Sequence, residues 1–324
     1  MRWFLALTLI CSEALAQEPP AWFAESLLFV REDAAAAAKE GKRVMLYFGQ
    51  DGCPYCKQLM EVNFRQARIV EKMQKSFVAL ALNIWGDREI HWDRSGSDGR
   101  ALSEKQLAVA LKVQFTPTLL FLDEKGEIAL RVNGYLPPGR FEAALDYVAR
   151  KMERKLAFSD YQKIPEKAHE KLNAQSFFMK PPYDLRRKSG AKPLAVLFET
   201  PLCAGCDELH REGFKRKEVL DRLAKFDVVR LSTADSLIAP GGQQVKASDW
   251  ASSLRLTYVP SMLFFDDRGR EVFRIEAYLR PFHLAGSLEY VASGAYRSEP
   301  SFQRFLQAEA ERQRARGETV DLWN

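Results

Sequence analysis

The sequence predicts an α/β protein made of two tandem copies of one unit, each with a central mixed sheet flanked by helices. Two observations lead to this prediction. A run of β-branched and aromatic residues at 44–48 is followed directly by a Cys-x-x-Cys pair and a helical pattern. The same arrangement returns 150 residues later. Strand-like and helical segments alternate in both copies, as expected for an α/β fold.

Length and composition are those of an ordinary globular protein. The chain has 324 residues, enough for about two domains at 100–200 residues each. It is 47% hydrophobic and 28% charged. The 48 basic and 43 acidic residues are spread along the chain, and no basic block interleaves with aromatic residues. We therefore expect no nucleic-acid partner.

The first 16 residues predict a signal peptide. Arg2 precedes an apolar run at 4–11, and Ala14-Leu15-Ala16 resembles a cleavage site, with cleavage near Ala16. The run is too short to span a bilayer. Cys11 admits a lipoprotein alternative, which the bulky Ile10 before it disfavours. We expect a periplasmic protein whose four remaining cysteines form two Cys-x-x-Cys pairs in an oxidising compartment.

The first half of the first unit follows a helix–strand–helix pattern. We expect a helix at 31–40 that stops at Gly41, the strand at 44–48, and a helix after the cysteine pair that breaks near Asn63. A helix at 67–75 and a strand at 77–84 follow. Residues 85–100 are rich in glycine and aspartate and predict a loop.

That loop contains one histidine and several acids: His91, Asp87, Asp93 and Asp98. Their spacing matches no recognised pattern of metal ligands, so a solvated polar loop is the favoured interpretation.

The second half of the unit predicts a helix, a hairpin and a closing helix. The helix covers 102–112, and Thr116-Pro117 then leads into strands at 119–122 and 128–132. An amphipathic helix is expected at 141–155. The predicted boundaries are 1–16 for the signal peptide, 21–156 for the first domain, 157–192 for a connector, 193–294 for the second domain and 295–324 for a helical tail. The tail is expected to dock on a domain or on a partner.

The internal repeat is visible without gaps over long stretches. An offset of 150 aligns Phe48, Cys53, Cys56, Leu59 and Phe64 with Phe198, Cys203, Cys206, Leu209 and Phe214. An offset of 143 aligns Pro117, Asp123, Gly126, Arg131, Tyr135 and Tyr147 with Pro260, Asp266, Gly269, Arg274, Tyr278 and Tyr290. Two long units indicate tandem domains, since solenoid repeats are far shorter.

The order of elements, with Cys-x-x-Cys after an early strand and X-Pro entering a hairpin, resembles the thioredoxin superfamily. Within it, the chain is most similar to exported thioredoxin-like proteins associated with bacterial sulfur-compound oxidation. This similarity lies in Gly-Cys-Pro-Tyr-Cys-Lys at 52–57, the insertion at 86–99, the run from Phe115 to Glu127, and Gly-Tyr-Leu at 134–136.

The first pair carries the predicted chemistry. Cys53 is expected to be the nucleophile, because a strand-to-helix turn exposes N–H groups that stabilise a thiolate. Cys56 is expected to resolve the mixed disulfide. The resemblance implies that Pro117 is a cis-proline and that Thr116 offers its backbone to a substrate strand; an ordinary trans-proline is the alternative.

The chain also departs from thioredoxin itself. Tyr47, and Leu197 in the second copy, stand where thioredoxin has a buried aspartate. Gly52 and Leu202 stand where thioredoxin has a tryptophan. We therefore expect slower resolution of the mixed disulfide, or resolution that uses water.

The second pair, Cys203 and Cys206, lacks the intervening proline and is accompanied by Val259-Pro260 in place of Thr116-Pro117. We expect a second redox-active pair, with a permanent disulfide as the alternative. Glu199 is either a proton acceptor or a surface or strand-end acid. His210 is expected on a helix face.

A zinc site built from all four cysteines is a further alternative. An oxidising compartment disfavours it, since the thiols would form disulfides there.

Together these features predict a periplasmic thiol–disulfide oxidoreductase that acts as a reductase or disulfide-handling enzyme. Pro54-Tyr55 is the dipeptide of glutaredoxins, and this resemblance implies a reducing couple. No cofactor and no metal are expected. The expected partners are exported proteins with disulfides or small thiols, and a membrane-bound electron donor. The alternatives are an electron relay between the two domains, or a partner-binding module with little turnover.

Overall fold

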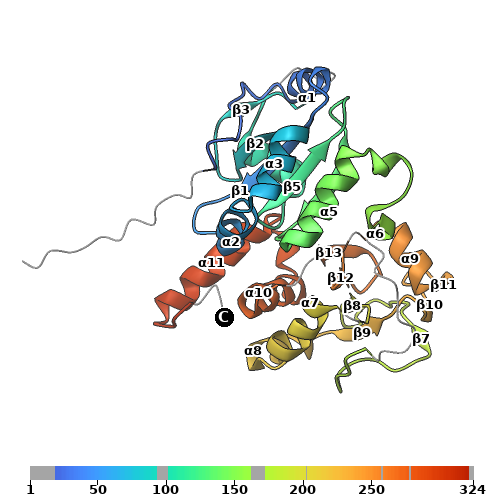
Figure 1. The fold of residues 1–324 in the computed structure, drawn as a ribbon. Coiled ribbons are helices and arrows are strands. Elements are labelled where there is room, and N and C mark those ends of the chain that lie inside the picture. The colour runs from blue at the N-terminus through green and yellow to red at the C-terminus, as the bar shows by residue number, and fades with distance from the viewer. Residues whose placement is uncertain are drawn as a thin grey trace, which may run out of the picture.

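The structure, a computed structural model, describes residues 19–92, 101–161, 172–201, 203–256, 258–276 and 279–320. Several predicted features lie outside these residues: the signal peptide, Cys11, Asp93 and Asp98, part of the connector (162–171), Leu202, Tyr278, and the last four residues. Two α/β units follow one another along the chain, and in Figure 1 the first, coloured blue to green, lies above the second. The predicted fold class is confirmed.

The first unit is built on a mixed four-stranded sheet with the order β2-β1-β5-β6. Strands β1 and β2 are parallel, and the other neighbours are antiparallel. The strands are β1 (Arg43–Gly49), β2 (Phe77–Asn83), β5 (Thr118–Leu122) and β6 (Ile128–Asn133). The helices are α1 (Val30–Lys39), α2 (Pro54–Gln58), α3 (Ala67–Ser76), α4 (Glu104–Ala110), α5 (Pro138–Ala149) and α6 (Phe158–Tyr161).

Strand β1 is buried along its whole length because helices cover both faces of the sheet. Met45 and Tyr47 face one core, with α3 and α5. Val44 and Phe48 face the other, with α1 and α4. This two-sided burial explains why the run is continuously apolar, and it holds the cysteine-bearing turn at a rigid strand end.

Three predicted segments differ in detail from the structure. The expected loop at 85–100 contains strand β3 (Glu89–Ile90), which pairs with β4 (Leu102–Ser103), and His91 stacks on Phe29 at 4.1 Å. Helix α4 starts two residues later than predicted, because Ser103 forms a capping box. Helix α5 starts three residues earlier, with a proline in its first turn.

The second unit repeats this plan with the sheet order β13-β12-β8-β9. Its strands are β8 (Leu194–Phe198), β9 (Asp227–Leu231), β12 (Ser261–Phe265) and β13 (Glu271–Ile275). Its helices are α7 (Ala204–Glu208), α8 (Lys217–Leu223), α9 (Ala247–Ser253), α10 (Pro281–Ala292) and α11 (Phe302–Ala315). The expected connector contributes β7 (Tyr183–Asp184) to a small sheet with β10 (Ser236–Ile238) and β11 (Gln244–Lys246).

Helix α11 corresponds to α6 in the first unit. Tyr147 donates its hydroxyl to the Leu156 carbonyl at 2.7 Å, and its counterpart Tyr290 donates to the Glu299 carbonyl at 2.6 Å. A helix follows each of these bonds, but α11 is 14 residues long and α6 only four. Phe302, at the start of α11, is fully buried in the second core. The expected tail helix therefore docks on the second unit.

The two units pack through equivalent surfaces. Asn133 donates to Glu276 at 3.1 Å, and these residues match each other at the offset of 143. Phe115 packs into the core of the second unit, and its counterpart Tyr258 packs against the core of the first. Contacts between equivalent residues are the mark of a two-fold relation. The loop before each repeated proline consequently touches the opposite unit.

No helix among the described residues has the length and apolar character needed to cross a membrane.

Candidate active site between the two units

The first cysteine pair lies at the start of α2, directly after strand β1 and the turn that joins the two elements. Gly52 supplies the turn with a φ of +67°, and Pro54 occupies the first helical turn. Cys53 is the N-cap residue, and its Sγ accepts the N–H of Cys56 at 3.1 Å. The two cysteines form a disulfide with a Cα–Cα distance of 5.2 Å.

The loop before Pro117 lies against this pair. The Thr116–Pro117 peptide bond is cis, as the resemblance implied. Cys53 Sγ is 3.4 Å from the Thr116 carbonyl oxygen, and Gln50 donates to the Thr116 hydroxyl at 3.1 Å. The structure thus brings Cys53, Cys56 and Thr116 together at one end of the sheet. Substrate binding by Thr116 and Pro117 stays a prediction.

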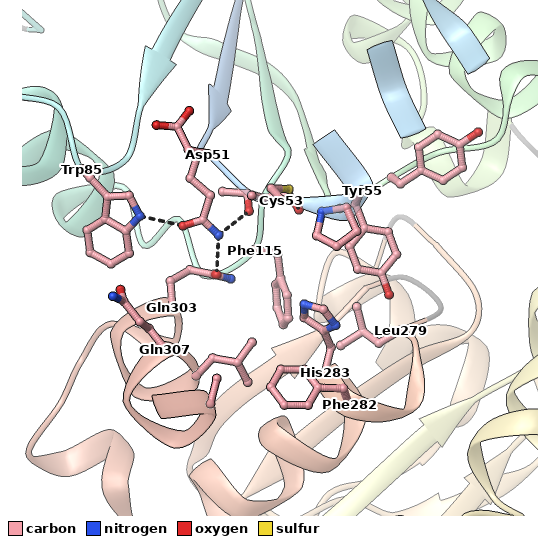
Figure 2. Close-up of a pocket in the computed structure, with 18 of the residues that line it drawn as sticks. Asp51, Cys53, Tyr55, Trp85, Phe115, Leu279, Phe282, His283, Gln303 and Gln307 are labelled. Carbon is pink, nitrogen blue, oxygen red and sulfur yellow. Dashed lines mark hydrogen bonds between the residues drawn. The ribbon is translucent and has the colours of Figure 1, made fainter. Parts of the chain in front are cut away.

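A cavity of about 430 Å³ opens beside Cys53, and both units line it (Figure 2). The first unit contributes the cysteine turn, Trp85, Phe115 and Thr116. The second unit contributes α10, α11 and the residues before them: Leu279, Phe282, His283, Gln303, Leu306, Gln307, Ala310 and Arg314. Sequence reasoning missed all of these, and only the expected docking of the tail helix hinted at them. Packing between domains leaves no local pattern in a sequence.

Hydrogen bonds fasten α11 to the first unit. Trp85 Nε1 donates to Gln50 Oε1 at 2.7 Å, and Gln50 Nε2 donates to Gln303 Oε1 at 2.8 Å, as Figure 2 shows. Gln303 Nε2 donates in turn to the Gln114 carbonyl at 2.8 Å. Because Gln303 is buried, this chain of amide groups holds α11 in a defined position beside the cysteine turn.

Helix α10 places a histidine next to the cysteine helix. The N–H of Arg280 donates to the Tyr55 hydroxyl at 2.7 Å, and the His283 ring meets the Tyr55 ring edge-on at 5.3 Å. Burial lowers the pKa of His283 to about 4, so its imidazole is neutral at pH 7. Its Nδ1 is buried and has no hydrogen-bond partner among the described residues.

Tyr47 occupies the position of the buried aspartate of thioredoxin. Burial raises the pKa of its phenol well above 10. A neutral phenol is no proton acceptor at pH 7, which leaves His283 as a neutral imidazole in the same cavity as Cys53.

The second pair has the same local geometry in different surroundings. Cys203 is the N-cap of α7, its Sγ accepts the Cys206 N–H at 3.1 Å, and the pair forms a disulfide. The Val259–Pro260 bond is cis. Arg140 of the first unit lies over the Tyr258 ring at 4.7 Å and donates to the Val259 carbonyl at 3.4 Å. A void of about 10 Å³ under Pro260 lies among core side chains and does not border Cys203.

A buried carboxylate and imidazole flank the second pair along the chain. His210 Nε2 lies 3.0 and 3.1 Å from the Glu199 carboxylate, and Gln175 lies 3.1 Å from His210 Nδ1. Glu199 directly follows β8 and is 2% exposed, so it is a strand-end acid, as one interpretation expected, but not a surface acid. His210 lies on a helical segment as expected, but it is buried and bonded. The role of Glu199 as proton acceptor stays a prediction.

Within the described ranges, no group of three or more histidine, cysteine or acidic side chains is arranged to hold a metal ion. Each cysteine pair closes a disulfide of its own.

Comparison with known structures gives matches of modest overall similarity. A thioredoxin-fold protein from Helicobacter pylori is 25% identical over 41% of this chain and 80% of its own, with a TM-score of 0.33. A thioredoxin from Thermus thermophilus is 25% identical over 37% and 83%, with a TM-score of 0.29. The first two thioredoxin domains of Eps1p from Saccharomyces cerevisiae are 12% identical over 76% and 88%, with a TM-score of 0.26. No curated protein matches the chain.

A protein-family model gives a clearer result. The model described as "Thioredoxin-like domain" matches residues 30–149 and 186–292, one range in each unit and together more than half of the chain. Each range contains a Cys-x-x-Cys pair at the start of a helix beside a cis-proline loop. This is the arrangement of a thiol–disulfide redox enzyme. The chain belongs to the thioredoxin-like domain family, and it carries that domain twice.

Proposed function

We propose that this protein is an exported, periplasmic thiol–disulfide oxidoreductase that reduces or rearranges the disulfides of its substrates through Cys53. One observation carries the proposal: Cys53 caps a helix N-terminus, accepts the Cys56 N–H at 3.1 Å and lines a cavity of about 430 Å³. A reactive cysteine must be reachable, and its thiolate must be stabilised.

The geometry supports exchange in two steps. In the reduced protein, the Cys53 thiolate attacks a substrate disulfide and forms a mixed disulfide, which releases one substrate thiolate. Cys56 then attacks Cys53 Sγ, closes the disulfide seen in the structure and releases the second thiolate. Two electrons pass from the cysteine pair to the substrate. A dithiol donor must restore the reduced pair, and a membrane-bound donor would suit an exported enzyme.

The compartment and biological setting rest on the sequence. The signal-like segment at 1–16 and the use of all other cysteines in Cys-x-x-Cys pairs support export to an oxidising compartment. The resemblance to exported thioredoxin-like proteins supports a setting in bacterial sulfur-compound oxidation. We expect mass spectrometry of the periplasmic fraction to find a mature N-terminus at Gln17. A protein that stays in the cytoplasm and keeps residues 1–16 would contradict export.

The second pair is proposed as a redox couple with its own potential. The buried Glu199–His210 pair supports this, because it places a potential proton acceptor within the segment that carries Cys203. Electron transfer between the two pairs remains the second candidate function, and the cross-packing of Phe115 and Tyr258 favours it by joining the two cis-proline loops to opposite cores.

Redox titration tests the proposal. The full-length mature protein is equilibrated in a series of glutathione buffers, free thiols are alkylated, and each pair is quantified by mass spectrometry. We expect Cys53–Cys56 to change from disulfide to dithiol within the buffered range. A pair that stays fully oxidised in the most reducing buffer would contradict the enzymatic role.

A further inference from the structure

We propose that the Cys53 site accepts a small disulfide of the amino-acid or short-peptide type and excludes extended protein segments, because the second unit forms one wall of the site and narrows it. This inference rests on the proposed oxidoreductase function and names its substrate class.

Helix α11 already packs against the loop that leads to Pro117. An extended peptide binds a sheet edge or loop through the backbone groups of that segment. Here α11 takes one backbone group of that loop, because Gln303 donates to the Gln114 carbonyl at 2.8 Å. The Phe302 N–H also donates to the Gln114 side chain at 3.0 Å, which holds α11 against the loop. The Gln114 side chain also donates to the Pro300 carbonyl at 3.1 Å. Thr116 is only 6% exposed.

The size and shape of the space that remains also favour a small substrate. The cavity of about 430 Å³ falls within the range of roughly 300–1,000 Å³ typical of small-molecule sites. Aromatic rings of Phe115 and Phe282 form part of its wall, and Cys53 stands at its edge (Figure 2). A molecule the size of an amino-acid disulfide fits such a space, whereas a folded protein would have to displace α11.

The wall of the cavity also carries polar groups. The amide of Gln307, the neutral imidazole of His283 and the guanidinium of Arg314 line it. The amide of Gln303 is already bonded to Gln50 and Gln114 and helps to hold the wall in place. Arginine binds carboxylates well, and amides pair with peptide groups. These groups match a molecule that carries carboxylate and amide or amino groups around its disulfide.

The reaction on such a substrate balances within the molecules named. The reduced Cys53–Cys56 pair loses two electrons and becomes a disulfide, and the substrate R–S–S–R gains them and leaves as two thiols. The two thiol protons of the pair go to the two leaving thiolates, directly or through water. A dithiol such as dithiothreitol prepares the reduced enzyme in the test.

The test compares substrates on the full-length mature protein. The protein is reduced with dithiothreitol, desalted and mixed with cystine, glutathione disulfide or insulin. Samples are quenched with acid at set times, free thiols are alkylated, and the oxidised fraction of the Cys53 pair is measured. We expect second-order rate constants for the two small disulfides at least about tenfold above that for insulin. Insulin reacting as fast as or faster than both small disulfides would overturn the proposal.

Two matched pairs of variants on α11 test the wall. Arg314→Ala should raise the KM for glutathione disulfide roughly tenfold, as expected for a lost charged hydrogen bond, while Arg312→Ala leaves it unchanged. Gln307→Trp should obstruct the cavity, because Gln307 lines it. Glu311→Trp is the matched control, because Glu311 lies one turn further along α11 and is not among the lining residues. Both tryptophan variants remove the same Gln307–Glu311 hydrogen bond, so the comparison isolates the obstruction.

Equal kinetics within each pair of variants would overturn the role of α11. The outcome for the proposed function is separate: if the Cys53 pair titrates in glutathione buffers and reacts with insulin as fast as or faster than with the small disulfides, the enzyme stands and the small-substrate inference fails. If the pair neither titrates nor reacts with any of the three disulfides, both fail.

Discussion

The two Cys-x-x-Cys sites share one scaffold and differ in what surrounds it. Cys53 and Cys203 are both N-cap residues whose Sγ accepts an N–H at 3.1 Å, and both pairs are disulfides. The first borders a cavity of about 430 Å³ that the second unit helps to line, whereas at the second Arg140 of the first unit lies over Tyr258 and donates to the Val259 carbonyl. Local geometry is therefore inherited from the repeat, and the neighbouring unit determines what surrounds each pair.

Equivalent positions show how this difference arises. His283 and Arg140 match at the offset of 143, and each faces the opposite unit. His283 leaves a cavity beside Tyr55, whereas Arg140 covers Tyr258 and reaches the Val259 carbonyl. The long α11 adds a wall to the first site, and its counterpart α6 is only four residues long.

The largest expected effect separates the two nucleophiles. Cys53→Ser should lower the rate of disulfide reduction by roughly a thousandfold or more, because it removes the attacking thiolate. Cys203→Ser should leave that rate within about threefold, because Cys203 is 3% exposed and Arg140 of the first unit covers the loop before Pro260. Steady-state assays with glutathione disulfide and dithiothreitol measure both. Equal losses in the two variants would indicate an obligatory relay.

The next effect concerns α6 and α11, the last helix of each unit. Phe302→Ala should cost about 3–5 kcal/mol of unfolding free energy, because the ring is fully buried and packs on Phe115, Phe273 and Tyr290. The variant should also loosen the wall of the Cys53 site. Phe158→Ala in α6 should cost a comparable amount without changing the KM for small disulfides. Urea denaturation and kinetics on both variants check this, and an equal KM change in both would contradict it.

The buried hydrogen-bonded pair Glu199–His210 distinguishes the second site. Glu199→Gln should destabilise the protein by about 1–3 kcal/mol, because it weakens a buried hydrogen bond to His210. The double variant Glu199→Leu/His210→Met should recover most of that loss, since it removes both polar partners. Of the two cysteine pairs, only Cys203–Cys206 should be reduced at a different rate in Glu199→Gln. An unchanged rate at that pair would argue against a role in proton transfer.

The smallest effect is a pH dependence specific to the first site. The pKa of His283 is lowered to about 4 from the 6.5 of a free histidine. As the pH falls, His283 is therefore protonated in the unfolded chain at a higher pH than in the folded protein. Its contribution to stability is therefore complete above about pH 6.5 and is lost progressively toward pH 4. At pH 5 the wild type should lose about 1–2 kcal/mol that His283→Gln retains. Arg140→Gln should leave this pH profile unchanged, and urea denaturation at pH 5 and 8 measures the difference.

Much of the fold follows from local patterns in the sequence. The apolar run of β1, the glycine stop after α1 and the prolines at 117 and 260 predicted their elements well, because each acts on its own segment. The cysteine pairs were predicted for the same reason. The wall of the cavity was not, since Gln303 and Gln50 are separated by 253 residues and meet only when the units dock. Burial of Glu199 was missed because an acid after a strand is usually solvated.

Trapping of mixed disulfides tests the central claim most directly. Reduced Cys56→Ser and Cys206→Ser variants are mixed with glutathione disulfide, quenched in acid and mapped by mass spectrometry, with free Cys-x-x-Cys thiols alkylated. The account predicts a glutathione adduct on Cys53 in Cys56→Ser, formed much faster than any adduct on Cys203 in Cys206→Ser. Adducts forming at equal rates on both cysteines, or first on Cys203, would contradict a first site opened and shaped by the second unit.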